Sequence, residues 1–593
     1  MVRAKAFGYG CVLLCVTLAA AQEPKHVVLD WTFQHLAVSG GRTPENLRAA
    51  KYEPRMLFHM PGQVEPNSPE QQFPVPPLAM QKKIDGSTSQ VRRNIKFDWS
   101  VSLGNGNIAP YMFPAKFQFA ANGTPSCAND YVVYGLNVAS SNTQANLVGI
   151  NNLYAGTGGI CGANPNVNWG YRGSTAAGSV LTSPVISIDG KKIAYVESAA
   201  GSAIFHVLTW KAGEGNVGTP VVPTLPTACT ATTSCLISVT FSGAATTTFA
   251  SPWIDYQTDK AFVASDDGKV YRISCVFQCA LNSNPTVDWT FTLPVAGTGG
   301  ATPRPNGPVY NFPYGYLTIG DQLGEVWVIN AGTSTPSLFA GPVMIGGGGC
   351  TVTNPPGRTG TPSPCTATGT AYGIPDSVII DSSGAAEKIF AFTGNDGTAG
   401  AAATVAQMNL DLTGIVRVHV GLGGVDLHSG TFDNKYFGNT PSSGELFLCA
   451  TGAADTTPYH YWIGFTNYPV MNSSFTGSLQ RIATAGISCA PYTEFFNPNL
   501  NLGGVTGDHD LLVSGLIGTG TNGYIITNDI STGAITAGLN NVNYPGGISG
   551  VIIDNSSTMG QNSNVYFSTL ASVNVGTCAN HRCAVKLSQA ALQ

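Results

Sequence analysis

Short apolar runs separated by turn residues recur along the chain from about residue 96 onward. The clearest copy begins at Ser251 with SPWIDYQTDKAFVASDDGKVYRIS and continues through VDWTFTL to Leu293. Runs of roughly four to eight apolar or alternating residues between Gly, Asp and Asn are typical of strands, and Asp266-Asp267-Gly268 is a tight hairpin signal. This stretch therefore predicts four short antiparallel strands.

The third strand of this unit, which starts at Lys269, has counterparts that set the period of the repeat. They start at Ala145, Ala203, Glu325, Thr404, Tyr459, Asn522 and Cys583. Consecutive starts are 55 to 79 residues apart, so the chain holds eight units of about 60 residues. This period predicts an all-β chain folded as a β-propeller of eight four-stranded blades, with seven blades as the alternative. A row of β-sandwich domains also has regular strands, but each sandwich needs roughly 100 residues.

The ends of the repeat predict how the ring closes. Val287-Asp288-Trp289 and Val167-Asn168-Trp169 mark outer strands, and Phe97-Asp98-Trp99 resembles both. The Trp99 segment precedes the first full unit, whereas the last unit ends soon after its third strand. We expect the strand around Trp99 to complete the final blade, which removes two exposed sheet edges. The Asp30-Trp31 pair, further upstream, has no place in this scheme.

The segments SPWIDY, AFVASDDGKVYRI and VDWTFTL resemble the repeat of quinoprotein-type (pyrroloquinoline-quinone-like, PQQ-like) propellers, and also uncharacterised exported bacterial propeller proteins. The likeness covers about residues 96 to 593 and is sharpest over residues 251–293. It implies the propeller fold. The quinone enzymes hold their cofactor with a vicinal disulfide and a metal site, but no two cysteines are adjacent in this sequence. PQQ is therefore not supported as a cofactor, and no cofactor residues are carried over.

The N-terminus has the order of a secretory signal. Arg3 and Lys5 precede an apolar run from about Phe7 to Ala20, and the small residues up to Ala21 suit cleavage there. A membrane anchor is the alternative, but a span needs roughly 20 apolar residues. We expect residues 1–21 to be a signal peptide, residues 22–95 an N-terminal arm with a Pro-rich linker, and residues 96–593 the propeller. The mature protein is expected to be secreted, at the cell surface or in the periplasm.

The cysteine count fits an oxidising compartment. Cys11 and Cys15 lie in the signal, and twelve cysteines remain. Their spacing favours six local disulfides. The candidate pairs are Cys127 with Cys161, Cys229 with Cys235, Cys275 with Cys279, Cys350 with Cys365, Cys449 with Cys489, and Cys578 with Cys583. Zinc binding is the alternative, and the segment from Cys578 through His581 to Cys583 comes nearest to a zinc cluster.

Composition and charge exclude some partners. Charged residues make up 10 % of the 593-residue chain, against about 25 % in ordinary soluble proteins, while 43 % of the residues are hydrophobic. The net charge is −5, and a weakly acidic chain argues against nucleic acid, which needs a concentrated basic face, and against anionic lipid as partners. No segment after the signal is long and apolar enough to predict a membrane span.

Catalytic motifs are absent from the sequence, and two loop clusters are the candidate sites. There is no Gly-x-Ser-x-Gly elbow, Walker loop or His-Glu-x-x-His pair. The first cluster holds Asp426, His428, Asp433, Lys435 and Tyr436, and the second holds Asp508, His509 and Asp510. Histidine beside carboxylates can bind a divalent metal such as Ca²⁺ or act as a general base. Turn capping is the alternative for both clusters, and we expect His206 and His460 to be packed, hydrogen-bonded histidines.

The export signal, the closed repeat and the lack of catalytic motifs favour a non-catalytic binding module for a protein or a glycan. The alternative is a quinone- or metal-dependent oxidoreductase, or a glycan-active hydrolase or lyase, with its site at the mouth of the propeller channel. That alternative rests only on analogy with other propellers. A third hypothesis gives the arm an assembly role.

Overall fold

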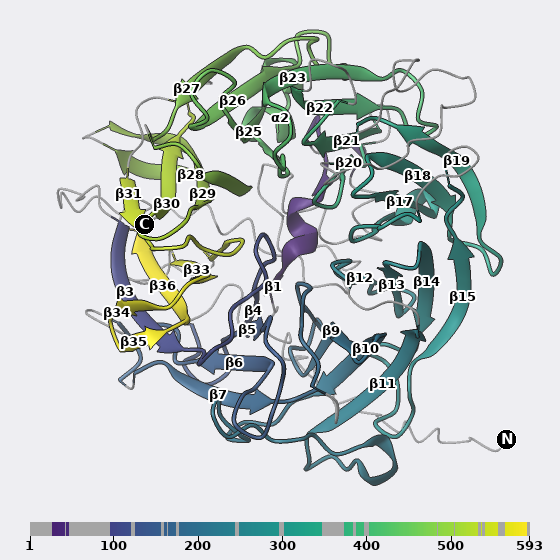
Figure 1. Cartoon of the computed structure of the whole chain (residues 1–593), viewed down its shortest axis with the longest axis vertical. Helices are drawn as coiled ribbons and strands as arrows, with labels where there is room; N and C mark the ends of the chain where they lie inside the picture. Colours follow the sequence, from purple (N-terminus) through teal and green to yellow (C-terminus); the bar gives the residue numbers. More distant parts are fainter. Residues whose placement is uncertain are drawn as a thin grey trace, which may run out of the picture.

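The described part of the chain forms eight sheets arranged as a ring (Figure 1). The computed structural model describes residues 27–41, 43–44, 46, 95–119, 125–155, 159–162, 164–173, 177–243, 248–295, 302–346, 373–383, 387–396, 402–482, 484–502, 505–531, 535, 540–554 and 564–589. Each sheet contains an antiparallel set of four neighbouring strands, with its first strand beside the central channel and its last at the rim. The predicted β-propeller of eight four-stranded blades is confirmed.

The strands of blades 1 to 4 follow one another from the channel outward. Blade 1 holds β4 (Ala115–Gln118), β5 (Tyr131–Gly135), β6 (Leu147–Asn151) and β7 (Asn166–Tyr171). Blade 2 holds β8 (Val185–Ile186), β9 (Lys192–Ala199), β10 (Ser202–Thr209) and β11 (Cys235–Ser242). Blade 3 holds β12 (Trp253–Asp255), β13 (Lys260–Ser265), β14 (Lys269–Ser274) and β15 (Thr286–Thr292). Blade 4 holds β16 (Val309–Asn311), β17 (Tyr316–Gly320), β18 (Glu325–Asn330) and β19 (Ser337–Met344).

Blades 5 to 8 are arranged from channel to rim in the same way. Blade 5 holds β20 (Ile379–Asp381), β21 (Lys388–Thr393), β22 (Ala402–Met408) and β23 (Val416–Leu422). Blade 6 holds β24 (Thr431–Phe432), β25 (Glu445–Thr451), β26 (Pro458–Gly464) and β27 (Gly477–Gln480). Blade 7 holds β28 (Ser488–Leu502), β29 (Val505–Ile517), β30 (Gly523–Asp529) and β31 (Asn540–Asn543). Blade 8 holds β32 (Ile552–Asp554), β33 (Asn564–Ser568), β36 (Cys583–Gln589) and β3 (Ile95–Ser102), with the small hairpin β34 (Val573–Val575) and β35 (Cys578–His581) between β33 and β36.

Strand β3 closes the ring as the sequence predicted. It pairs antiparallel with β36, so that Trp99 lies opposite Lys586 although the two residues are nearly the length of the propeller apart in sequence. The Trp99 indole N–H also donates to the Leu153 carbonyl of blade 1, at 2.9 Å. The outer strand of the last blade therefore comes from the start of the propeller, and it covers the edge of β36 that would otherwise be unpaired.

Apolar side chains fill the spaces between neighbouring blades. In β18, the residues Val326, Trp327, Val328 and Ile329 are all fully buried. Successive side chains of a strand point to opposite faces, so an inner strand is apolar throughout only when both faces are covered. The unbroken apolar run that marked this strand in the sequence thus reflects its place between blades 3 and 5.

Buried charges gather at the junction where blade 8 meets blade 1, with one ion pair across it and one within blade 8. Lys116 of β4 pairs with Asp554 of β32 at 2.8 Å, and Lys586 of β36 pairs with Asp98 of β3 at 2.6 Å. All four side chains are at most 4 % exposed. The Tyr154 ring lies close to both ammonium groups, at 5.9 and 5.7 Å from its centroid. The closing junction of the ring therefore contains a compact ionic network in addition to its apolar packing.

Five of the six predicted disulfides are confirmed. They join Cys127 to Cys161, Cys229 to Cys235, Cys275 to Cys279, Cys449 to Cys489, and Cys578 to Cys583. The predicted pair of Cys350 and Cys365 lies outside the described residues. Four bridges are local, whereas Cys449–Cys489 links β25 of blade 6 to β28 of blade 7. None of the helices in the described part of the chain has the length and apolarity needed to cross a lipid bilayer.

Candidate functional site

The central channel of the ring is occupied by the chain's own N-terminal arm. Strand β1 (Val27–Leu29) pairs antiparallel with β4 of blade 1, and β2 (Leu36–Ala37) pairs parallel with β20 of blade 5. The short 3-10 helix η1 (Trp31–Gln34) lies between them. Figure 1 shows this purple segment at the centre of the ring. The arm therefore occupies the place where propellers most often bind ligands.

The Asp30-Trp31 pair anchors the arm in the channel. Asp30 caps η1 by accepting a hydrogen bond from the Thr32 amide at 3.0 Å. The Trp31 side chain is 2 % exposed, and its indole N–H donates to the Pro252 carbonyl at 3.1 Å. The ring also meets Trp253 of blade 3 edge-on, with centroids 5.7 Å apart. The pair that lay outside the sequence repeat thus fixes the arm to the repeat.

Polar contacts extend this anchoring to further blades. The Gln34 amide donates to Thr493 Oγ1 at 2.7 Å and to the Val551 carbonyl at 3.3 Å, in blade 7 and beside blade 8. His35 Nδ1 lies 3.3 Å from the Val378 carbonyl beside blade 5. Burial lowers the pKa of His35 to about 4, so its imidazole is neutral at physiological pH. Together with β1 and Trp31, these contacts join the arm to blades 1, 3, 5, 7 and 8.

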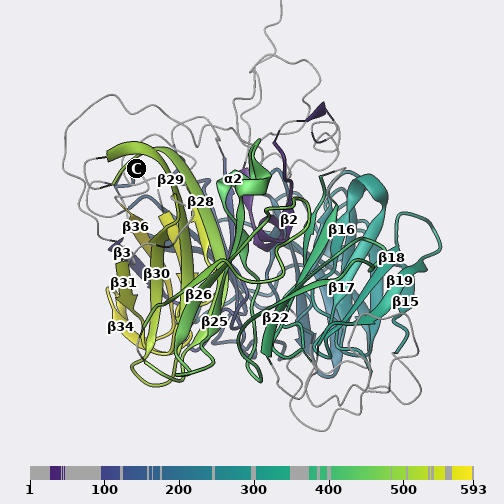
Figure 2. The same cartoon turned by 90° about the horizontal axis from the view of Figure 1, so that it is seen from above.

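The arm leaves the channel beside helix α2 (Asn434–Phe437), which lies near the upper face in Figure 2. The Gly40 and Gly41 amides donate to the carbonyls of Tyr436 and Phe437, at 3.3 and 2.9 Å. The Ser39 amide donates to Asp381 Oδ1 at 3.2 Å. Tyr436, which the sequence marked as a candidate site residue, helps to hold this exit.

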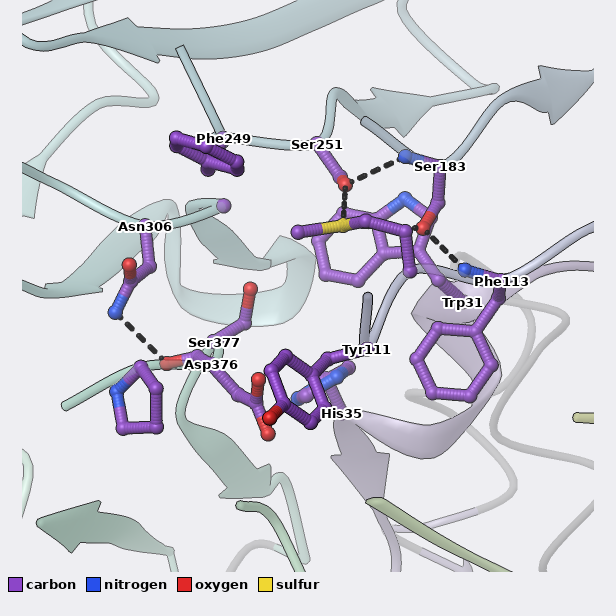
Figure 3. Close-up of a pocket in the computed structure, with 13 residues that line it drawn as sticks. Trp31, His35, Tyr111, Phe113, Ser183, Phe249, Ser251, Asn306, Asp376 and Ser377 are labelled. Carbon is purple, nitrogen blue, oxygen red and sulfur yellow. Dashed lines mark hydrogen bonds between the residues drawn. The ribbon is translucent and has the colours of Figure 1, made fainter. Parts of the chain in front are cut away.

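A narrow recess remains between the arm and the blades (Figure 3). Trp31, Tyr111 and Phe249 supply its aromatic walls. The polar groups of its wall already bond one another, because the Phe113 amide donates to Ser183 Oγ and the Ser183 amide donates to Ser251 Oγ, both at 2.9 Å. These bonds tie successive blades together. The recess is thus a small packing gap between the arm and the blades, and it is too small for a substrate molecule.

His428 of the first candidate cluster lies beside this recess and bonds a residue that the sequence did not single out. Its Nδ1 lies 2.9 Å from Asp376 Oδ2, and the Tyr111 ring stacks on the imidazole with centroids 3.6 Å apart. Burial acts to raise the pKa of Asp376, but His428 and the Ser429 amide outweigh it and hold the pKa below its usual value. Tyr111 has a φ of 67°, a conformation that costs energy for a residue with a side chain.

Of the other members of the first cluster, only Asp426 stays near His428. Burial raises the pKa of the Asp426 carboxyl group, and His428 acts in the opposite direction. Asp433 caps α2, since its Oδ1 accepts from the Tyr436 and Glu445 amides, both at 3.0 Å. Lys435 is half-buried on α2. The hydroxyl of Tyr436 donates to Asp381 Oδ2 at 2.7 Å.

The second cluster meets the first at α2. Asp510 Oδ2 accepts from the Asn434 amide at 2.7 Å. His509 Nδ1 bonds Asp529 Oδ2 at 3.0 Å instead of pointing to a shared site with Asp510. Asp508 belongs to β29, and its side chain lies outside the described residues. Turn capping, the alternative to a binding site, therefore accounts for Asp433, which caps α2. It accounts in part for Asp510, which accepts the amide N–H of the first residue of α2.

Several acids crowd around α2. Burial raises the pKa of Asp433 to about 6, and that of Glu445 and Asp510 to about 7. Burial also raises the pKa of Glu494 well above its usual value. Across the described ranges, no three His, Cys, Asp or Glu side chains are placed to hold one metal ion. The raised pKa values of these acids predict a pH dependence of stability.

The two strand histidines are hydrogen-bonded, as expected. His460 of β26 is fully buried, and its Nε2 accepts from the Asn528 amide group at 3.0 Å. His206 of β10 bonds a side chain at each ring nitrogen, Ser238 at Nδ1 and Glu197 at Nε2.

No protein-family model matches the chain, and no curated protein matches its sequence. Solved structures share its architecture at low identity. Sqt1 from Chaetomium thermophilum is 9 % identical with a TM-score of 0.45, covering 83 % of this chain and 98 % of that one. A dihydro-heme d1 dehydrogenase, NirN, is 10 % identical with a TM-score of 0.37, covering 82 % and 79 %. A putative 6-phosphogluconolactonase from Bacteroides fragilis is 11 % identical with a TM-score of 0.37, covering 72 % and 98 %. The eight-bladed ring follows from the sheet topology, and these distant likenesses carry no function to this chain.

Proposed function

We propose that the chain is an exported propeller that acts as a binding module, and that it docks its partner through one face of the ring. The N-terminal signal pattern and the paired cysteines support export. The channel is filled by the arm, which leaves the faces of the ring as the surfaces where a partner can bind. The likeness to quinoprotein-type repeats supports no more than the shared architecture.

The two faces of the ring differ in the connections that form them. In each four-stranded blade, the connections between the first and second strands and between the third and fourth strands lie at the same end. The remaining connections lie at the opposite end. Helix α2 connects β24 to β25, and the arm leaves the channel beside it. We call the face with the first kind of connection the arm face; it is the upper face in Figure 2.

Exposed apolar side chains concentrate on the arm face, and this observation carries the proposal. Within the described ranges, nine large apolar side chains are between 37 % and 59 % exposed. Seven lie in the arm-face connections or at the start of the strand that follows one: Phe119, Leu225, Tyr314, Leu338, Phe339, Val470 and Phe475. Val222 belongs to the long connection between β10 and β11, but it lies at the far end of β7, where Val221 bonds Gly170 and Arg172. The ninth, Val295, follows β15 on the opposite face. In this proposal, these side chains supply the apolar contacts of the docking surface.

Disulfides stiffen the same face. Cys229–Cys235 and Cys275–Cys279 each clip a connection between a third and a fourth strand, and Cys127–Cys161 joins two arm-face connections of blade 1. A loop that is ordered before binding loses less conformational entropy when the partner docks. The apolar side chains lie on blades 1, 2, 4 and 6, and so broad a distribution favours a protein partner over a glycan.

The alternative enzyme, with its site at the channel mouth, requires the arm to leave the channel. The arm is held by two strand pairings and the buried Trp31. No observation on the described residues favours that displacement, so the binding module is the better-supported function.

The test compares the two faces of the ring. The mature chain is screened for binding to intact producer cells and to a glycan array. The apparent affinity is then measured for the cells or the glycan to which the chain binds. The variant Leu225→Ala/Phe339→Ala/Phe475→Ala should bind at least about tenfold more weakly, because truncating central apolar anchors typically costs more than about 1 kcal/mol each. Val295→Ala, on the opposite face, is the matched control and should bind like the unmodified chain.

Two results would contradict the proposal. One is full binding by the triple variant together with weakened binding by Val295→Ala. The other is a mature N-terminus, determined by protein sequencing, that still carries residues 1–21. Binding to the array but not to cells would replace the protein partner with a glycan and leave the arm face as the docking surface.

A further inference from the structure

A chain of hydrogen bonds on blade 2 links a serine to a buried carboxylate through a histidine. Ser238 Oγ lies 2.6 Å from His206 Nδ1, and His206 Nε2 lies 2.9 Å from Glu197 Oε2. The histidine and glutamate side chains are 3 % and 0 % exposed, whereas Ser238 on the outer strand is half-buried. A serine on a partly buried outer strand is thus connected to a carboxylate that is fully buried.

The strand register brings these residues together. His206 of β10 lies opposite Ser238 of β11 and opposite Tyr195 of β9. Glu197 is two residues beyond Tyr195, so it projects from the same face of the sheet. The Tyr195 ring packs against the imidazole with centroids 5.0 Å apart. The imidazole is held both by packing and by hydrogen bonds at its two nitrogens.

The neighbouring blade holds the carboxylate in place. The amide group of Asn146 in blade 1 donates to Glu197 Oε1 at 2.7 Å. Asn146 is itself fixed, because it donates to the Gly178 carbonyl and accepts from the Gly173 amide, both at 3.0 Å. A β-carbon at Gly178 would collide with the Glu197 carboxylate. These glycines leave the space that the carboxylate fills.

We propose that Ser238, His206 and Glu197 form a nucleophilic triad that accepts acyl groups from small carboxylic esters at the Ser238 hydroxyl. The arrangement has the features of an activated serine: a base within hydrogen-bond reach and a third group that orients the base. In this triad, His206 Nδ1 faces the Ser238 hydroxyl, and the His206 Nε2–H group donates to the Glu197 carboxylate. This activity is separate from docking at the arm face and does not depend on it.

The chemical step balances within these residues. The Ser238 hydroxyl proton moves to His206 Nδ1 while Oγ forms a bond to the ester carbonyl carbon. The bond from that carbon to the alkoxy oxygen then breaks, and the departing oxygen takes the proton from Nδ1. The products are acyl-Ser238 and the free alcohol. Water repeats the sequence and returns the proton to Ser238. The Ser238 backbone is held in place, because its amide N–H donates to the Asn284 side-chain oxygen at 3.0 Å.

A fluorophosphonate probe tests the proposal on the full mature chain. Ser238 Oγ attacks phosphorus, fluoride leaves, and the proton departs with it, so one adduct per chain is expected by intact-mass analysis. Peptide mapping should place the adduct on Ser238, and Ser238→Ala should carry none. Ser478→Ala is the matched control, because Ser478 lies on an outer strand opposite Tyr461 instead of a histidine. It should be labelled like the unmodified chain.

The rate of labelling by the probe distinguishes a serine that a base activates from a serine that only packs against its neighbours. His206→Gln should lower the labelling rate at least about 100-fold, the lower limit of general-base catalysis. Glu197→Gln keeps the side-chain shape and should lower the rate at least about tenfold, since the orienting acid also contributes strongly. Circular dichroism confirms that each variant folds. If Glu197→Gln does not fold, Ser238→Ala and His206→Gln decide the question, as both are small changes.

The unmodified chain should also release one equivalent of p-nitrophenolate from p-nitrophenyl acetate in an initial burst. Absence of label from the unmodified chain would overturn the proposal, as would an adduct that persists in Ser238→Ala. Labelling of His206→Gln at the unmodified rate would do the same, because it would show a serine that needs no base.

Discussion

At the scale of single residues, the polar groups of this ring find their partners on other strands and other blades. His428 illustrates why sequence could not predict its site. Its neighbours in the chain suggested Asp426 as the partner, whereas its bonded carboxylate is Asp376, 52 residues earlier. Likewise, Ser238, His206 and Glu197 become neighbours only through strand register. A single sequence shows residue types and local spacing, but it does not show which side chains the blades bring together.

The acids around α2 predict an unusual pH dependence of stability. Burial raises the folded-state pKa of Asp433 to about 6 and that of Asp510 to about 7, while unfolded carboxyl groups titrate near pH 4. The folded chain therefore binds these protons more tightly than the unfolded chain. Their contribution to stability is fully present below about pH 4 and is lost as the pH rises through 6 to 7.

The unmodified chain should accordingly gain several degrees more in melting temperature than Asp510→Asn when the pH falls from 8 to 5, measured by calorimetry at constant ionic strength. Comparing the two chains cancels the contribution of His35, whose lowered pKa acts in the opposite direction. Equal changes in the two chains would show that the Asp510 carboxyl group ionises freely in the folded chain.

At the scale of elements, the sequence predicted the blades and the presence of an N-terminal arm, but it did not predict that the arm lies in the channel. The third strands were found because they recur about every 60 residues as apolar runs, and burial between blades explains those runs. The arm has no such period. Its strands β1 and β2 span only three and two residues, and their partners β4 and β20 lie far along the chain. Only the Asp30-Trp31 pair signalled it, and no repeat position explained that pair.

Trp31→Ala should release the arm from the channel. The substitution removes a buried indole, its bond to the Pro252 carbonyl and its contact with Trp253, and large-to-small changes of this kind typically cost about 3 to 5 kcal/mol. A broad-specificity protease should then cleave within residues 27–41 much faster than in the unmodified chain. Cleavage sites are located by mass spectrometry.

Tyr314→Ala, which truncates an aromatic side chain that is 40 % exposed, is the control. It should leave cleavage of the arm unchanged. Equal resistance of Trp31→Ala and the control would mean that the strand pairings alone hold the arm.

At the scale of the whole molecule, closure of the ring depends on the junction between blades 8 and 1. The sequence predicted that the strand around Trp99 completes blade 8, because Phe97-Asp98-Trp99 has the pattern of an outer strand but precedes the first full unit. The buried ion pairs of the junction were beyond prediction. Lys116 and Asp554 come from opposite ends of the propeller and meet only once the ring is closed.

Lys586→Met should weaken this junction strongly. It leaves the Asp98 carboxylate buried without its counter-charge, and breaking one side of a buried pair typically costs about 3 to 5 kcal/mol. The urea midpoint of unfolding should fall clearly. Lys586→Met combined with Asp98→Asn removes both charges and should recover part of the loss. If the double variant is as unstable as the sum of the two single variants, the pair makes no coupled contribution.

The central claim is that the chain's own arm fills the channel, so that docking falls to the arm face. Hydrogen–deuterium exchange of the unmodified chain tests it most directly. Peptides covering residues 27–41 should exchange as slowly as those covering β4 and β20, because the arm pairs with both strands and is buried against the ring. Complete exchange of residues 27–41 within seconds, while β4 and β20 stay protected, would show an empty channel and contradict this claim.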